Sequence, residues 1–187
     1  MEAKMILVWL LVLVLVSPVV AGIFAQRSPA VNGELLPFCE RADELGPEDV
    51  SILIQTLGQS EHPWMQRDAI CALGKMRGRA ADAVPALVQV LRSSDPDLPF
   101  VAANALGDIG PGAVLPLIQA LGDGNERVRW FAAYALGQIG PDARDAIPAL
   151  ARVLEEERNR SVREAAAEAL EAVTALEWSA DAPDWQQ

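Results

Sequence analysis

The sequence predicts an all-α protein, an α-solenoid of about four stacked helical hairpins. The first observation is a repeat: the dipeptide Ala-Leu recurs at 72–73, 105–106, 135–136 and 169–170, at spacings of 33, 30 and 34 residues. Periods of this length are typical of helical-hairpin arrays. The second observation is that apolar residues recur at i, i+3, i+4 and i+7, which is the spacing of one face of a helix.

Composition limits the classes of function. With 187 residues, 51% of them apolar, the chain can bury a sizeable core. Its formal net charge of -11 argues against nucleic acid as a partner, because phosphate binding needs a clustered positive surface. An acidic balance of this size is ordinarily a matter of solubility.

The first 25 residues have the layout of a signal peptide or an N-terminal membrane anchor. An uncharged apolar run at 5–16 follows Lys4 and is followed by small residues, so cleavage is expected between about 21 and 25. Residues 5–25 are also long enough to cross a bilayer, but Pro18 would interrupt that helix and the apolar run before it has only twelve residues, which favours a cleaved signal. Both alternatives place the rest outside the cytoplasm, either exported to the periplasm or extracellular space or anchored in the membrane.

Residues 26–46 are predicted to be a linker that leads into an N-terminal cap. The segment mixes proline, glycine and charges without a sustained period, and only its last part, 39–45, has the pattern of a short helix.

The repeat domain is predicted over 47–177, as hairpins at 47–78, 79–110, 111–140 and 141–177. Turn signals separate them, and the third hairpin is three residues short before its first helix. Residues 178–187 lack any period and are predicted to be a flexible tail. The expected buried stripes of the first helices are Val50, Leu53, Ile54, Leu57; Val84, Leu87, Val88, Leu91; Val114, Leu117, Ile118, Leu121; and Ile147, Leu150, Ala151, Leu154.

The second helix of each hairpin carries a more specific pattern. Residues 128–137 read Val-Arg-x-x-Ala-Ala-x-Ala-Leu-Gly, with weaker copies at 65–74 and 98–107. The pattern resembles the HEAT repeat and, more narrowly, the HEAT-like repeats first associated with phycobilisome (PBS) lyases. The resemblance implies an armadillo-like α-α superhelix whose second helices line a concave surface. The sequence departs from it at Gln66 and Pro99, which replace the motif arginine, and at Glu171, which replaces the last glycine.

Outward positions of these second helices are the candidate partner-binding residues. They are Arg67, Phe100, Asn104, Trp130 and Tyr134. Large aromatic rings that point outward from neighbouring helices form an exposed patch of the kind that marks binding. The alternative is that Phe100 and Trp130 are buried against the neighbouring repeat.

Catalysis, a metal and a cofactor are not expected. His62 is the single histidine, and its setting between Glu61 and Pro63 favours a turn or capping role. A catalytic triad would have to use it, and no nucleophile motif lies nearby. Deoxyhypusine hydroxylases, which are HEAT-repeat enzymes that bind iron through His-Glu pairs, are excluded because the sequence has no such pair.

The cysteines are the last candidate site. Cys39 and Cys71 lie 32 positions apart, without the spacing of a zinc site. Cys71 is predicted to face the same way as Tyr134, so it could meet the cap that carries Cys39. If the chain is exported, a disulfide between them is chemically permitted; in the cytoplasm both would be ordinary thiols.

Two functional hypotheses follow. The first is a non-enzymatic scaffold, exported or membrane-anchored, that binds another protein through its concave face. The second, implied by the family resemblance, is an accessory or catalytic protein of bilin attachment in which Phe100, Trp130 and Tyr134 contact the tetrapyrrole. Export discriminates between them, because phycobiliproteins are assembled in the cytoplasm.

Overall fold

The computed structural model describes residues 38–59 and 63–180, and the side chains of 38–58 and 63–174. The predicted signal or anchor, most of the linker, His62 and most of the tail lie outside the described residues. Residues from Phe38 onward belong to one compact unit. Within its described part there are helices and turns and no strand, so the all-α solenoid is confirmed.

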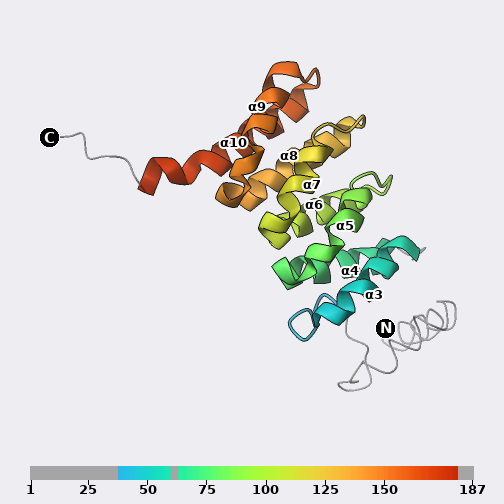
Figure 1. Ribbon diagram of the computed structural model, residues 1–187. Helices are drawn as coiled ribbons and strands as arrows, with labels where there is room; N and C mark the ends of the chain where they lie inside the picture. The colour runs from blue at the N-terminus through green and yellow to red at the C-terminus, as the bar shows by residue number, and fades with distance from the viewer. Residues whose placement is uncertain (1–37, 60–62, 181–187) are drawn as a thin grey trace, which may run out of the picture. The chain divides into compact units, whose positions relative to one another are not determined.

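Four hairpins follow one another along the chain (Figure 1). The first pairs α3 (Pro47–Gln59) with α4 (Pro63–Met76), and the second pairs α5 (Val84–Val90) with α6 (Leu98–Ile109). The third pairs α7 (Val114–Ala120) with α8 (Glu126–Ile139), and the fourth pairs α9 (Ile147–Glu156) with α10 (Arg160–Ala180). The last helix therefore continues beyond residue 177, where the sequence pattern predicted the tail to begin.

Short 3-10 helices connect the hairpins. They are η1 (Arg77–Ala83), η2 (Gly110–Ala113) and η3 (Gly140–Ala146), and η2 has 4 residues where the others have 7. This difference is the three-residue shortening predicted for the third hairpin. The chain leaves α6 and α8 through Gly110 and Gly140, at φ 81° and 67°, whereas it leaves α4 through Arg77 at φ 53°. Glycine adopts positive φ without the steric cost that a side chain adds. The exit from α4 at Arg77 is therefore the strained one.

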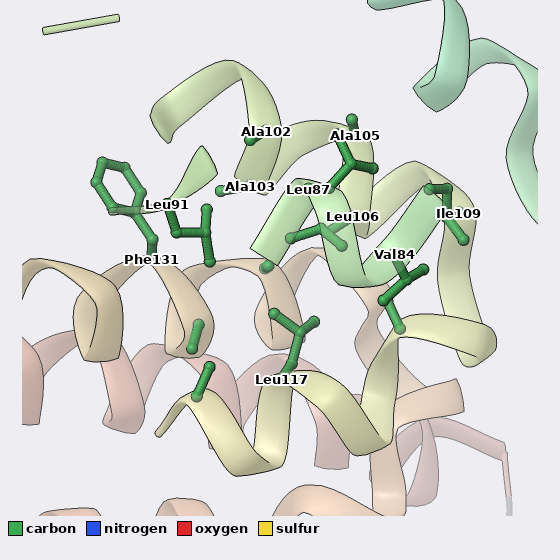
Figure 2. Close-up of a cluster of buried hydrophobic side chains, with 14 of the residues drawn as sticks. Val84, Leu87, Leu91, Ala102, Ala103, Ala105, Leu106, Ile109, Leu117 and Phe131 are labelled. Atoms are coloured by element: carbon green, nitrogen blue, oxygen red, sulfur yellow. The ribbon is translucent and has the colours of Figure 1, made fainter. Parts of the chain in front are cut away.

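The hairpins form two layers. Helices α4, α6, α8 and α10 pack side by side as a second layer, and α3, α5, α7 and α9 form the first layer. Buried side chains of both layers meet in one continuous core; Val84, Leu87, Leu106 and Leu117 are four of those drawn in Figure 2. One hairpin cannot bury both of its apolar stripes, so stability depends on the contacts between neighbours.

Small residues set the spacing of the second layer. A Cβ atom added to Gly74 would lie 3.0 Å from Cα of Ala105, and one added to Gly137 would lie 3.2 Å from Cα of Ala169. In α4 and α8 the glycine of the Ala-Leu-Gly motif thus admits the alanine backbone of the next helix, whereas a Cβ atom added to Gly107 of α6 would lie 2.7 Å from Cβ of Gln138. This is the physical reason for the alanine-rich pattern.

One predicted core position is wrong. The fourth stripe was expected to end at Leu154, but this side chain is 36% exposed, and Val153 is buried instead. The equivalent leucines Leu57, Leu91 and Leu121 are buried. Leu154 lies in the fourth hairpin, after which the described residues contain no further hairpin to pack against it.

The segment Leu98–Ala120 is, by length and apolar composition alone, able to span a bilayer. In the fold it comprises α6, η2 and α7, and the chain turns at Gly110. Leu106 and Leu117 of this stretch are fully buried in the repeat core, whereas Phe100 and Leu115 are exposed. We therefore assign this stretch to the core.

Candidate partner-binding face

The outward positions of the second layer occupy equivalent places in successive helices. We call this surface the second-layer face and define it by two rows of residues. The first row is Arg67, Phe100, Trp130 and Glu164. The second row is Cys71, Asn104, Tyr134 and Glu168. None of these eight side chains is fully buried. All five predicted partner-binding residues lie on this face.

Three aromatic rings form a cluster that joins α6 to α8. The rings of Trp130 and Tyr134 are stacked at 8° with centroids 5.4 Å apart, and the ring of Phe100 lies 5.5 Å from that of Tyr134. The hydroxyl of Tyr134 donates a hydrogen bond of 3.0 Å to Oδ1 of Asn104. The structure thus brings four of the five predicted residues together, and we call them the aromatic cluster.

The cluster is partly packed and partly open. Phe100 is 45% exposed, whereas Trp130 and Tyr134 are half-buried and pack against the core. Phe131, which faces inward, meets the ring of Trp130 edge-on at 5.0 Å. Each of the two expectations for these rings therefore holds in part. Packing orients the rings of Trp130 and Tyr134, and their remaining exposed surface, together with Phe100, is available for contact with a partner.

The fifth predicted residue, Arg67, forms an ion pair with Asp97. Its Nη2 atom is 2.6 Å from Oδ2 of Asp97, and both side chains are more than half exposed. An exposed pair of this kind contributes little to stability, so Arg67 can exchange Asp97 for another carboxylate.

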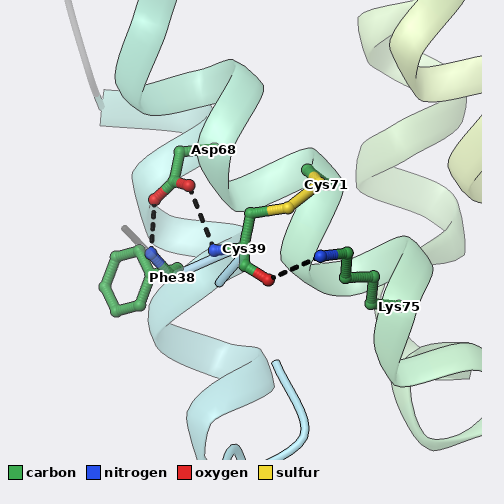
Figure 3. Close-up of a disulfide and its surroundings, with 5 residues drawn as sticks. All are labelled: Phe38, Cys39, Asp68, Cys71 and Lys75. Atoms are coloured by element: carbon green, nitrogen blue, oxygen red, sulfur yellow. Dashed lines mark hydrogen bonds between the residues drawn. A yellow bond between two sulfur atoms is a disulfide. The ribbon is translucent and has the colours of Figure 1, made fainter. Parts of the chain in front are cut away.

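The cysteines join the N-terminal cap to the edge of the same face (Figure 3). Cys39 and Cys71 are bonded as a disulfide with their Cα atoms 5.3 Å apart. The cap residues 38–44 form consecutive turns, not the short helix expected from the sequence. Ala42 and Leu45 are buried by this arrangement, which closes the apolar end of the first hairpin.

Asp68 and Lys75 hold the cap at the same point. The Asp68 carboxylate accepts hydrogen bonds from the backbone N–H groups of Phe38, at 2.7 Å, and Cys39, at 3.0 Å. Lys75 Nζ donates to the carbonyl oxygen of Cys39 at 3.1 Å. Burial raises the pKa of Asp68 above its ordinary value, although the two N–H donors act in the opposite direction.

A second set of polar contacts ties the loops of the third and fourth hairpins. Arg129 contacts Glu157 through Nε at 2.6 Å and Nη2 at 3.1 Å, and its Nη1 donates to the carbonyl oxygen of Asp123. The hydrogen bond from Arg129 holds the pKa of Glu157 below its ordinary value, and the backbone N–H of Asn159 adds to this. Sequence reasoning found the motif arginine but missed Glu157 and Asn159, which lie in a loop without any period.

These loops border an open groove of about 670 Å³, lined among others by Arg129, Arg152, Glu156 and Glu157. Its charges are mixed, and Arg129 and Glu157 already satisfy each other. Among the described residues, no group of three or more His, Cys, Asp or Glu side chains could hold a metal ion. We therefore regard the aromatic cluster as the better candidate site.

Two family models match the sequence. Residues 84–171 match a model described as HEAT repeats, and residues 65–93 match one described as PBS lyase HEAT-like repeat. A comparison with proteins of curated function gives no match.

Solved structures resemble the fold at low sequence identity. An engineered protein is 22% identical, with 84% of this chain and 81% of that chain covered and a TM-score of 0.46. A designed armadillo repeat protein in complex with the peptide (KR)4 is 20% identical, with 82% and 80% covered and a TM-score of 0.45. At these values the similarities concern the fold alone.

Proposed function

We propose that the protein is a non-enzymatic scaffold that binds another protein through the second-layer face. The matches of residues 84–171 to HEAT repeats and of residues 65–93 to the PBS lyase HEAT-like repeat support this role. The observation that carries the proposal is the aromatic cluster. Rings from two neighbouring repeats form one surface, and partly exposed aromatic side chains are the usual anchors of protein interfaces.

The spacing of the helices supports the choice of this face as the concave one. Gly74 and Gly137 admit the backbone of the next helix at close range. A stack of hairpins bends toward the layer whose helices lie closer together, so the second layer is expected on the inner side of the curve. A concave surface can surround a partner segment and bury more of it than a flat one.

The polar part of the cluster fits the same role. Asn104 Oδ1 accepts the Tyr134 hydroxyl hydrogen, which leaves the Asn104 amide N–H groups directed elsewhere. This amide can donate to a carbonyl oxygen of a partner, while the rings supply apolar contact.

The test replaces Trp130→Ala and Tyr134→Ala together. The matched control is Leu115→Ala, which removes an apolar side chain that is 67% exposed on α7 in the other layer. We expect the double variant to lose capture of the partner that co-purifies with the full chain from its native host, and the control to retain it. Circular dichroism should show equal helicity.

A different result would assign the rings to packing. If the double variant melts far below the parent and still captures the partner, the cluster serves the fold and not binding. Equal loss of capture in the Leu115→Ala control would place the interface on the other layer.

The proposed location is outside the cytoplasm, by export or by membrane anchoring. It is supported by the apolar run at 5–16 and by the short Cα–Cα distance of the Cys39–Cys71 pair, since structural disulfides persist in oxidising compartments. Residues 1–30 fused to a reporter that is active only after export should give activity. The same fusion with Leu10, Leu11 and Leu13 changed to Asp should not, and equal activity of both would refute targeting.

Bilin attachment is the second candidate, favoured by the match of residues 65–93 to the PBS lyase HEAT-like repeat. In that case Phe100, Trp130 and Tyr134 would contact the tetrapyrrole. Mixing the full chain with a free bilin and a phycobiliprotein subunit tests it. A covalent adduct that depends on the chain would replace the scaffold proposal, and an unchanged bilin absorption spectrum would remove this candidate.

A further inference from the structure

The charge of the second-layer face changes along the stack. In the first row, the basic Arg67 on α4 is followed by Phe100 and Trp130 and then by the acidic Glu164 on α10. The second row ends in the same way, with Tyr134 followed by Glu168. The aromatic cluster is therefore bordered by two carboxylates on the helix that follows it.

The packing of α8 against α10 fixes this neighbourhood. The position for a Cβ on Gly137 lies 3.2 Å from Cα and 3.5 Å from Cβ of Ala169. Tyr134 lies one helical turn before Gly137, and Glu168 immediately precedes Ala169, so the two side chains start at similar heights on the adjacent helices. Packed helix axes lie ~8–10 Å apart, a distance that one long side chain can bridge.

Both carboxylates can take a new partner. Glu168 is exposed and forms no ion pair among the described side chains, and Glu164 pairs only with Arg160 at 2.7 Å on its own helix. The side chains of that pair are 84% and 56% exposed, and such pairs contribute little. A cation from a partner can therefore replace Arg160 at small cost.

We propose that the aromatic cluster together with Glu164 and Glu168 binds a basic, extended segment of a partner protein. This inference rests on the proposed scaffold function and names the chemistry of its partner. The aliphatic stem of a Lys or Arg side chain lies against Phe100, Trp130 and Tyr134, and its charged end reaches the carboxylates of α10. Cation–π attraction to the rings adds to this.

The charge of the chain favours this occupant over two others. A second copy would bring a further net charge of -11, and an acidic segment would meet Glu164 and Glu168 directly. Like charges that face each other oppose association, whereas opposite charges speed it and select the partner. A basic segment matches the charge of the face at its α10 end, where Glu164 and Glu168 lie.

The experiment measures binding of short labelled peptides to the full chain by fluorescence anisotropy. In the first peptide Lys alternates with Ser and Ala; in the second Glu replaces Lys, and in the third Leu replaces Lys. The variant is Glu164→Gln with Glu168→Gln, which keeps shape and removes two charges. Its control is Glu155→Gln with Glu156→Gln on α9, which removes two charges from the other layer.

We expect the Lys peptide alone to bind. Its affinity should fall by about 3- to 10-fold in the α10 variant, as expected for two exposed ion pairs, and fall with added salt. Trp130→Ala with Tyr134→Ala should lower it further, and the α9 control should leave it unchanged.

Two results would overturn the proposal. If the α9 control weakened binding of the Lys peptide as much as the α10 variant does, the net charge of the protein alone would attract the peptide. Binding of the Leu or the Glu peptide in preference to the Lys peptide would exclude a basic partner while leaving the scaffold function intact, provided that the binding needs Trp130 and Tyr134. Capture of the native partner that survives loss of the rings would instead refute the scaffold face itself.

Discussion

The two ends of the array are closed by different means. At the N-terminal end, an irregular cap covers the first hairpin and buries Ala42 and Leu45, and the Cys39–Cys71 bond attaches it to α4. At the C-terminal end, among the described residues, no such cover lies over α10. There Leu154 is partly exposed, and the outer side of α10 carries glutamates.

The difference teaches how the stack stops. Gly74, Gly107 and Gly137 leave room for the next helix of the second layer, and the equivalent position in α10 is Glu171, which is exposed. A glutamate side chain at that position occupies the space that a further helix would need and disfavours stacking through its charge. Within the described residues, a disulfide-linked cap therefore covers one end of the array, whereas α10 presents glutamates at the other.

The largest expected effect on stability comes from a core substitution in α8, between the two ends of the array. Leu136 is fully buried in α8, so Leu136→Ala should destabilise the protein by about 2–5 kcal/mol because it opens a cavity between stacked helices. Chemical denaturation measures the change. Leu115→Ala is the exposed control, and a Leu136→Ala variant as stable as that control would contradict the assigned packing.

Removal of the disulfide should act on one end only. Cys39→Ser with Cys71→Ser opens a loop of 32 residues, which the chain-entropy model values at about 3–4 kcal/mol. We expect hydrogen exchange to rise in the cap and α4 and to stay unchanged in α10. Thiol counting on denatured, unreduced protein is the complementary measurement: two free thiols per chain would show that the bond does not form.

Acid should affect the two ends in opposite directions. The pKa of Glu157 is lowered by Arg129, so its stabilising contribution is present above the unfolded value near 4.5 and is lost as pH falls below it. The pKa of Asp68 is raised by burial, so its ionisation lowers the free energy of unfolding as pH rises through and above the unfolded value near 3.8.

Glu157→Gln should therefore flatten the acid loss of stability, and Asp68→Asn should steepen it. Urea denaturation between about pH 3 and pH 6, the range around both ordinary values, measures the two slopes. Identical slopes in both variants and the parent would show that the pKa of neither carboxyl differs between the folded and unfolded states.

The smallest effect on stability is expected from Glu171→Gly, which restores the glycine that the other three helices carry. Helix propensity alone predicts a loss of about 0.5–1 kcal/mol. If Glu171 prevents further stacking, the variant should self-associate more than the parent in sedimentation velocity. Glu168→Gly carries the same propensity cost on the same helix and is the control; equal association of both variants would refute the closing role.

The sequence predicted the hairpins well because their signals are local and repeated. The stripe that ends at Leu57, Leu91 and Leu121 is set by helical periodicity, and all three side chains are buried as expected. The same rule failed at Leu154, since burial there depends on a neighbour that periodicity does not encode. The turns of 38–44 were likewise misread as a helix, because their conformation depends on contacts with Asp68 and Lys75, some thirty residues away.

The candidate site was predicted in its membership but not in its geometry. Helical spacing alone placed Phe100, Asn104, Trp130 and Tyr134 on one side of the second helices. It could not predict the Tyr134–Asn104 hydrogen bond or the stacked rings, since these depend on the distance and register of adjacent helices. Arg67 has the same helical position and is paired with Asp97, which helical spacing did not predict either.

By itself, the sequence determined that this chain is a stack of helical hairpins, where the turns between successive hairpins lie, and which side of most helices faces the core. It could do so because these properties arise from periodicity, turn residues and small side chains within one repeat. The tertiary structure decided how the repeats meet: the burial of Trp130 and Tyr134, the ion pair of Arg129 with Glu157, and the different closure of the two ends. Those contacts join residues about thirty positions apart, and their free energy exists only when the helices are packed.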